Sequence, residues 1–191
     1  MSLLNIVGVS GSVRRPSRTT ELVRQVGSEF ARLRASRFEL IELAEIGAGV
    51  GAFSREDLPA AGQSALAAIE SADALIVGSP IYKGSYTGLF KHLFDFVDPL
   101  ALVRRPVALT ATGGGRRHAL AVEHQLRPLF GFFSANTLPT SVYASDEDFR
   151  DGNLTDPGTL DRVRQVAAEL ADALSIKRAA SVRSVPLDRV A

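Results

Sequence analysis

A cluster of hydroxyl and guanidinium groups lies between residues 10 and 19, directly after an apolar stretch. The hydroxyls belong to Ser10, Ser12, Ser17 and Thr19, and the positive charge to Arg14, Arg15 and Arg18. Side chains of both kinds donate hydrogen bonds to anions such as phosphate. Gly8 and Gly11 let the backbone approach a ligand closely. The pattern predicts a phosphate-binding loop, and the alternative is an ordinary strand-to-helix turn rich in Ser and Gly.

The spacing of this loop differs from that of the familiar phosphate motifs. It contains neither G-x-G-x-x-G nor G-x-x-x-x-G-K-[ST], so a site for a triphosphate with magnesium is not expected. The sequence Gly8-Val9-Ser10-Gly11 misses the G-x-S-x-G nucleophile elbow by one residue. We therefore interpret Ser10 as part of a binding element and not as a nucleophile.

Two further loops carry residues suited to a flat polar ring. Backbone groups for the ring edge are offered by Pro80, Ile81, Tyr82, Lys83, Gly84 and Ser85, and by Thr112, Gly113 and Gly114. A phosphate at the first loop and a ring against the other two describe flavin mononucleotide (FMN). The positive charge of Lys83 would then lie near a reduced, anionic flavin. The alternatives are a solvated lysine at a helix start and a plain glycine turn.

Hydrophobic periodicity places these loops at the ends of strands. The near-continuous apolar run over 3–9 predicts a central parallel strand, and the period over 19–34 predicts an amphipathic helix. Further strands are predicted over 38–43, 74–77, 106–111 and 137–143, and further helices over 64–71, 89–97, 118–133 and 157–176. Pro139 argues for an edge position of the last strand. The region 44–62 is interpreted as a Gly/Ala/Pro-rich loop.

The alternation of strands and helices predicts an α/β fold with an open, doubly wound, five-stranded parallel sheet in the order 2-1-3-4-5. We expect residues 1–176 to form one domain and 177–191 to form a loose or partner-dependent tail. Ligands of such sheets bind beyond the carboxyl ends of the strands. The loops after the first, third and fourth strands should therefore converge on one site.

Composition excludes several functional classes. The 191 residues carry a net charge of +1, so nucleic acid is not an expected partner. The absence of cysteine excludes disulfides and thiol catalysis, and suits a reducing cytoplasm. No apolar segment approaches a membrane span and no signal peptide is evident, so we expect a cytoplasmic protein without membrane contact. The histidines at 92, 118 and 124 share no helix face, so no metal site is expected.

The motifs resemble those of the flavodoxin-like NAD(P)H-dependent FMN reductases, from Leu3 to about Leu174. The matching motifs are G-S-x-R-x-x-S at Gly11–Ser17, S-P-x-Y-x-G-S-Y-T-G at Ser79–Gly88 and T-G-G at Thr112–Gly114. The stretches 113–120 and 123–131 are most similar to the reductase components of two-component methanesulfonate and alkanesulfonate monooxygenase systems.

The resemblance implies a flavodoxin-like fold and an oxidoreductase that transfers a hydride from NADH or NADPH to FMN. Reduced FMN would pass to an FMNH2-dependent monooxygenase that desulfonates sulfonates for sulfur acquisition. Phosphate contacts are implied for Ser10, Ser12, Arg14, Ser17 and Thr19. The cofactor carries the chemistry, so no catalytic residue is assigned. The alternatives are a quinone or azo-type reductase with bound FMN, and a non-catalytic flavodoxin-like electron carrier.

The helix predicted over 118–133 should be disturbed near His124. Pro128 lacks an N–H group and crowds the carbonyl of His124, four residues earlier. Either a simple kink or one widened π-turn relieves this crowding. The resemblance implies a widened turn associated with subunit contacts and flavin release. The alternative is a plain proline bend with a solvated His124.

The apolar residues of the helices predicted over 89–97 and 118–133 exceed what one sheet face needs, which predicts a homo-oligomer. A dimer or tetramer is expected, and the resemblance implies a tetramer of paired dimers. Light scattering at micromolar protein should give a multiple of the 20.4 kDa chain mass. A single species of the chain mass would contradict this prediction.

Overall fold

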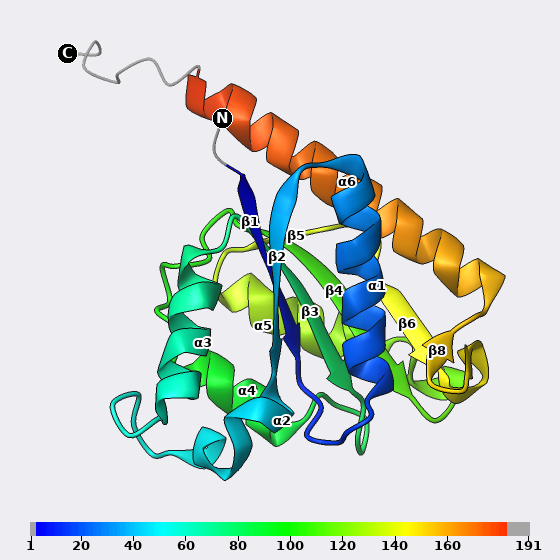
Figure 1. Ribbon diagram of the computed structural model, residues 1–191, viewed down its shortest axis with the longest axis horizontal. Coiled ribbons are helices and arrows are strands. Elements are labelled where there is room, and N and C mark those ends of the chain that lie inside the picture. Colours follow the sequence, from blue (N-terminus) through cyan, green and yellow to red (C-terminus); the bar gives the residue numbers. More distant parts are fainter. Residues whose placement is uncertain (1–2, 183–191) are drawn as a thin grey trace.

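A sheet of parallel strands forms the centre of the molecule, with helices on both faces (Figure 1). The computed structural model describes residues 3–182, with side chains up to residue 176. The strands β1 (Leu4–Ser10), β2 (Ser36–Glu42), β3 (Ala74–Pro80), β4 (Pro106–Gly113) and β5 (Asn136–Thr137) follow the order β2-β1-β3-β4-β5. All of these pairings are parallel. The predicted fold class and strand order are confirmed.

The fifth position of the sheet is shared by two short strands. Both β5 and β6 (Val142–Ser145) pair with β4, so the predicted edge position is confirmed. The prediction of one continuous strand over 137–143 is wrong, because Pro139 lies in the gap between the two. Proline has no N–H group for the ladder and therefore interrupts the pairing.

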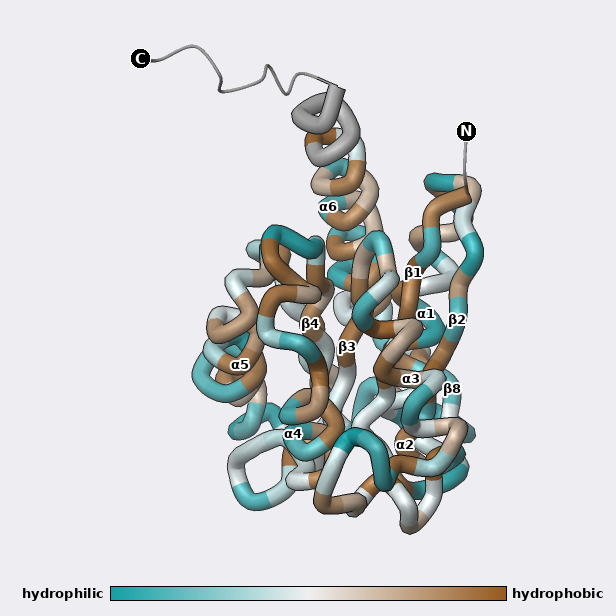
Figure 2. The backbone as a smooth tube through the Cα atoms, turned by 90° about the vertical axis from the view of Figure 1, so that its left-hand side faces the viewer, coloured by the Kyte–Doolittle hydropathy of each residue, from teal (hydrophilic) through white to brown (hydrophobic). Residues whose placement is uncertain are grey.

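The helices divide the hydrophobic core into two layers. On one face α1 (Arg18–Leu33) packs with α6 (Pro157–Val182). On the other lie α3 (Ala60–Ser71), α4 (Gly88–Asp95) and α5 (Arg127–Phe132). Figure 2 shows brown, hydrophobic segments of the central strands between these layers. No helix in the described part of the chain combines the length and apolarity needed to cross a membrane.

The last helix, α6, is longer than predicted. Its first turn is capped by Asp156, whose carboxylate accepts a hydrogen bond from the Thr159 N–H at 2.8 Å. The helix continues beyond the predicted end at 176 as far as Val182. The rest of the predicted tail, residues 183–191, lies outside the described residues.

The region 44–62, expected to be a loop, is partly helical. It contains α2 (Leu43–Ile46) and a 3-10 turn (Gly47–Gly51), and α3 begins at Ala60. Leu43, Ile46 and Val50 are buried in the core next to α3. Burial of these apolar side chains holds a Gly-rich segment that has weak helix propensity of its own.

The segment predicted as one helix over 118–133 consists of three parts. A 3-10 turn (Arg116–His118) is followed by a π-helical turn (Val122–Leu126) and by α5. At the junction the Arg127 N–H donates to the carbonyl of Val122, five residues earlier. The predicted disturbance around His124 is therefore confirmed as a widened turn.

A two-stranded hairpin was not predicted. It pairs β7 (Phe149–Arg150) with β8 (Asn153–Leu154) in antiparallel fashion. Its turn residues Asp151 and Gly152 have φ values of 49° and 81°. Asp-Gly is a strong signal for such a turn, because both residues tolerate positive φ.

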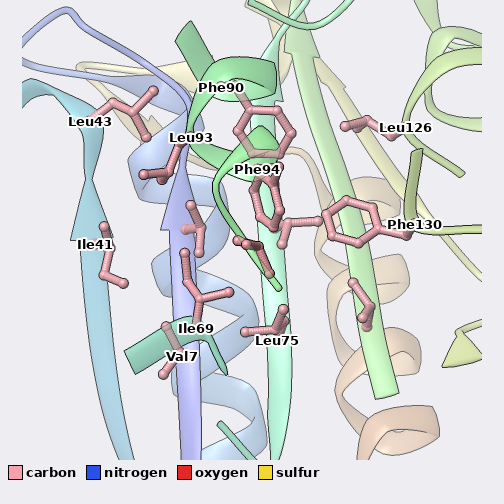
Figure 3. Packing of buried hydrophobic residues seen from close by; sticks show 14 of the residues in the cluster. Val7, Ile41, Leu43, Ile69, Leu75, Phe90, Leu93, Phe94, Leu126 and Phe130 are labelled. Atoms are coloured by element: carbon pink, nitrogen blue, oxygen red, sulfur yellow. The ribbon is translucent and has the colours of Figure 1, made fainter. Parts of the chain in front are cut away.

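Phenylalanine side chains pack tightly between α4, α5 and the sheet (Figure 3). Phe94 lies at the centre of this cluster, with ring centroids 4.9 Å from Phe90, 5.0 Å from Phe130 and 6.4 Å from Phe133. Offset and edge-to-face contacts of this kind add to the burial of the rings. Much of the apolar surface that predicted an oligomer is thus buried within the chain itself.

Some apolar side chains of these segments remain exposed, and the oligomer stays a prediction. Phe132 is 71% exposed, and Leu120, Leu100 and Val103 are also exposed. Leu120 and Phe132 lie within the helix predicted over 118–133, and Leu100 and Val103 follow the helix predicted over 89–97. Their neighbours Phe130 and Phe133 are buried and offer little surface to a partner.

We expect Phe94→Ala to lower the free energy of unfolding by about 3–5 kcal/mol, because it leaves a cavity among three other rings. Urea denaturation followed by circular dichroism measures this change. Phe53→Ala is the matched control, since Phe53 is 100% exposed and its loss should change stability by less than about 0.5 kcal/mol. Equal effects of the two substitutions would contradict the packing described here.

Candidate functional site

The first loop connects the end of β1 to the N-terminus of α1. The Ser17 hydroxyl oxygen accepts a hydrogen bond from the Thr20 N–H at 3.2 Å and so caps the helix. The Ser12 hydroxyl oxygen accepts one from the Arg14 N–H, also at 3.2 Å. The first N–H groups of a helix lack helical partners and lie at the positive end of its dipole. This end of α1 is therefore suited to an anion.

The arginines of the first loop have different surroundings. The Arg14 guanidinium carbon lies 5.8 Å from the ring centroid of Tyr82, a residue of the second loop. Arg15 pairs with the carboxylates of Glu42 and Glu45. Arg18 pairs with Asp146 at 2.7 Å. Among the described residues, Arg14 is the arginine of this loop that has no carboxylate partner.

Two hydroxyls predicted to contact phosphate are engaged inside the protein. Ser10 and Thr20 share a hydrogen bond of 2.8 Å between their hydroxyls, and Thr20 donates to the Glu42 carboxylate at 3.0 Å. Thr19 shares one of 2.6 Å with Thr112 at the start of the third loop. All four of these hydroxyl side chains are buried. Ser10 and Thr19 therefore hold the loop from its inner side.

The second loop follows β3 and forms a tight two-residue turn. Tyr82 and Ser85 exchange backbone hydrogen bonds of 2.9 and 3.2 Å. The residues between them, Lys83 and Gly84, have φ values of 54° and 86°, as a type I′ turn requires. Pro80 and Ile81 are buried at the base, whereas Lys83 is exposed at the tip.

Thr87 joins the first and second loops, a role that sequence reasoning missed. Its hydroxyl donates to the Gly11 carbonyl at 2.9 Å, and its N–H donates to the Ser79 hydroxyl at 3.1 Å. The Phe90 N–H in turn donates to the Thr87 hydroxyl, so Thr87 also caps α4. A threonine directly before an apolar helical run is the available signal for such a cap.

The third loop follows β4 and is bound to its neighbours at both ends. At its start the Thr112 carbonyl accepts a hydrogen bond from the Ile81 N–H at 2.7 Å. At its end the Gly115 carbonyl accepts one from the Tyr143 hydroxyl at 2.6 Å. Gly114 lies between these points, with open space where a side chain would project. The three predicted loops therefore meet at one edge of the sheet.

The π-helical turn is connected to this site. The Ser85 hydroxyl of the second loop donates to the side-chain oxygen of Gln125 at 3.1 Å. Glu123 and Arg127 form a bidentate ion pair across the turn, and Ser141 donates to the same carboxylate at 2.8 Å. The hydrogen bond from Arg127 is the main cause that lowers the pKa of Glu123.

The side chains of His124 and Pro128 are exposed on the outer side of this turn. In the described part of the chain no group of three His, Asp or Glu side chains is arranged to hold a metal ion. His92 is engaged elsewhere, with its Nε2 atom 2.7 Å from the Ala52 carbonyl oxygen.

A groove of about 530 Å³ lies beside the three loops, between the segment 116–123, the start of β6, Asp148 and the start of α6. Its charged lining is largely paired within the chain. Arg162 donates to the Ser141 carbonyl at 2.8 Å, and Asp156 accepts from Thr159. The Asp148 carboxylate accepts hydrogen bonds from the backbone N–H and the hydroxyl of Ser145. We therefore place the candidate site at the three loops and not in this groove.

The sheet order and the loops at its carboxyl edge define a flavodoxin-like α/β protein. The family model described as "NADPH-dependent FMN reductase" matches residues 4–150, and the chain belongs to this family.

Similar proteins agree with this assignment. The chain is 50% identical to "NADH-dependent FMN reductase SfnF" of Pseudomonas fluorescens, over 88% of this chain and 90% of that protein. It is 48% identical to "FMN reductase (NADPH)" of Pseudomonas aeruginosa, over 89% and 91%. A solved oxidoreductase from Corynebacterium diphtheriae superposes with a TM-score of 0.81 at 30% identity, covering 92% of this chain and 99% of that chain. The apo form of "NADH:FMN oxidoreductase (EMOB)" superposes with a TM-score of 0.72 at 28% identity, covering 96% of this chain and 92% of that chain.

Proposed function

We propose that this chain transfers a hydride from NADH or NADPH to FMN and supplies the reduced flavin to a partner monooxygenase. The convergence of three loops at the carboxyl edge of the sheet carries this proposal, in a chain that belongs to an FMN reductase family. One relative is named as NADH-dependent and another as NADPH-dependent, so both nucleotides are candidate reductants. The sulfonate-desulfonating partner system is part of the proposal.

The residues of the first loop fit an FMN phosphate. Arg14 offers a guanidinium group without a carboxylate partner among the described residues, and α1 offers the free N–H groups of its first turn. Ser12 and Ser17 lie in the same loop. We assign phosphate contacts to these three side chains, and we assign to Ser10 and Thr19 the support of the loop from inside.

The second and third loops fit the ring of FMN. Backbone groups of residues 80–85 and 112–114 would meet its polar edge, with Lys83 at the exposed tip of the second loop. An added Cβ atom at Gly84 or Gly114 meets nothing within 4 Å, so both loops leave open space beside them. We propose that residues 1–176 form a single FMN-binding domain built around these loops, in the cytoplasm and without membrane contact.

The chain contributes binding and orientation to the reaction. When bound, FMN supplies the ring that accepts the hydride, so no side chain needs to act as acid or base in that step. Arg14 and the N-terminus of α1 would hold the phosphate, and the interlocked second and third loops would orient the ring. A fixed ring orientation would reduce the entropic cost of bringing the nicotinamide and the ring together.

Steady-state oxidation of NADH and of NADPH tests the proposed activity. We expect oxidation that depends on added free FMN, and weaker oxidation with a quinone as the only acceptor. Efficient quinone reduction with flavin that stays bound would favour the quinone or azo-type reductase. Absence of NAD(P)H oxidation with FMN retained would favour an electron carrier.

We expect Arg14→Ala to lower FMN affinity by roughly ten- to one-hundred-fold, because a charge-assisted hydrogen bond is worth about 1.5–3 kcal/mol. Titration of FMN fluorescence measures the dissociation constant. Arg15→Ala is the matched control, since it makes the same charge change next door but Arg15 is paired with Glu42 and Glu45. Equal affinities of the Arg14→Ala and Arg15→Ala proteins would refute the assignment of Arg14.

Ser17→Ala serves as a second variant for the same loop. It should weaken FMN binding and also lower the free energy of unfolding by about 1 kcal/mol, because Ser17 caps α1.

Deletion of His124 tests the role proposed for the π-helical turn in subunit contacts and flavin release. Removing one residue from a turn with i to i−5 bonding should restore a regular α-helical turn. We expect a folded protein that retains FMN more tightly, turns over free FMN poorly and has altered oligomeric mass. The substitution His124→Ala, which keeps the residue count, should leave flavin turnover near the wild-type value. Normal turnover of the deletion variant would contradict this role.

A further inference from the structure

We propose that Tyr143, which lies outside all three loop motifs, is a positioning residue whose hydroxyl group holds the third loop in the shape that binds the flavin ring. The contact between Tyr143 and the loop is a property of the described structure. Its consequence for flavin rests on the proposed function.

Tyr143 lies on β6, directly beside the strand that leads into the third loop. In the parallel pairing of β4 with β6, Tyr143 is the register partner of Ala111. Its side chain reaches four residues further along that strand and loop, to the carbonyl oxygen of Gly115 at 2.6 Å. The hydroxyl therefore fixes the far end of the loop.

The near end of the loop is fixed independently. The Thr112 carbonyl accepts from the Ile81 N–H at 2.7 Å, and the Thr112 hydroxyl shares a bond of 2.6 Å with Thr19. Gly113 and Gly114 are thus held between two anchored residues. Gly113 is also the register partner of Ser145 on β6, and the Gly115 carbonyl also accepts from the His118 N–H at 3.3 Å. Loss of the Tyr143 hydroxyl would remove the shorter of the two hydrogen bonds to the Gly115 carbonyl and give the glycines more conformational freedom at this end of the loop.

Gly113 shows that the loop is fitted closely around this hydroxyl. A Cβ atom added at Gly113 would lie 2.5 Å from the Tyr143 hydroxyl oxygen, and 3.4 and 3.6 Å from the ring carbons Cζ and Cε2. A side chain at residue 113 would therefore have to displace the Tyr143 hydroxyl from its position beside the Gly115 carbonyl. A Cβ atom added at Gly114 or Gly115 would have no neighbour within 4 Å.

Partial burial favours the form of the side chain that this contact needs. Burial raises the pKa of Tyr143, with smaller contributions that include the Gly115 hydrogen bond, which lowers it. The phenol therefore stays protonated at neutral pH and can donate to the carbonyl. A partly buried hydroxyl that lost this acceptor would be left without a partner at a cost in free energy.

The test is a double-mutant cycle of Tyr143→Phe and Gly113→Ala, read out as the FMN dissociation constant by fluorescence titration. Tyr143→Phe should weaken FMN binding by roughly two- to tenfold, the value of one neutral hydrogen bond. Gly113→Ala should weaken binding strongly in the wild-type background, because the new methyl group collides with the hydroxyl. The same substitution should do much less harm in the Tyr143→Phe background, where that oxygen is absent.

Hydrogen exchange of the loop amides in the flavin-free protein gives a second readout that needs no FMN. Tyr143→Phe should speed exchange over residues 113–116 while the melting temperature stays close to that of the wild type. Gly51→Ala is the matched control for Gly113→Ala in the binding measurement. A Cβ atom added at Gly51 meets nothing within 4 Å, and Gly51 lies far along the chain from the loop.

Two results would overturn the proposal. One is additive effects of Tyr143→Phe and Gly113→Ala on FMN binding, and the other is unchanged exchange over residues 113–116. If the wild-type protein bound no FMN at all, the proposed function would fail, but the exchange measurement would still decide whether Tyr143 positions the loop.

Discussion

The parallel register of β1, β3 and β4 is the constraint on which the rest of the structure depends. It places Ser10 beside Gly78 and Pro80 beside Thr112, so the loops after these strands leave the sheet at the same edge. Right-handed crossovers through helices on both faces hold this arrangement. Hydrogen bonds between neighbouring loops add to those within each loop, such as the turn closed by Tyr82 and Ser85.

Hydroxyl groups form the connections between the loops. Thr87 joins the second loop to the Gly11 carbonyl, and Thr19 and Thr112 join the first loop to the third. These bonds are buried, where an unpaired polar group would be costly and a paired one is correspondingly specific. The three loops are therefore joined to one another by hydrogen bonds between side chains and backbone.

The π-helical turn shows how one proline sets the geometry of a whole segment. Pro128 has no N–H group to donate to the His124 carbonyl, and the preceding Arg127 N–H donates to the carbonyl of Val122, five residues earlier. The Glu123 and Arg127 pair then spans the widened turn, and Gln125 reaches Ser85 in the second loop. A local backbone irregularity is thereby connected to the candidate site.

Much of this protein follows from its sequence alone, because the signals involved are local or periodic. The apolar run of β1 and the alternation with amphipathic helices determined the sheet order, and the Gly, Ser and Arg spacing determined which loops converge. Pro128 determined where the helix would be disturbed. The loop motifs and the proline act within a few residues, and the sheet order follows from general rules for connecting parallel strands through helices.

Other features were decided only by the tertiary structure. The sequence does not show that Ser10 and Thr19 turn inward, because their partners Thr20 and Thr112 are reached only when the loops pack together. Nor does it show that Gly113 makes room for Tyr143, which is 30 residues away in the chain and becomes its neighbour through the pairing of β4 with β6. The helical turns at 43–51 likewise form because Leu43, Ile46 and Val50 are buried against α3 and its surroundings. These features depend on contacts between distant segments, which composition and periodicity do not encode.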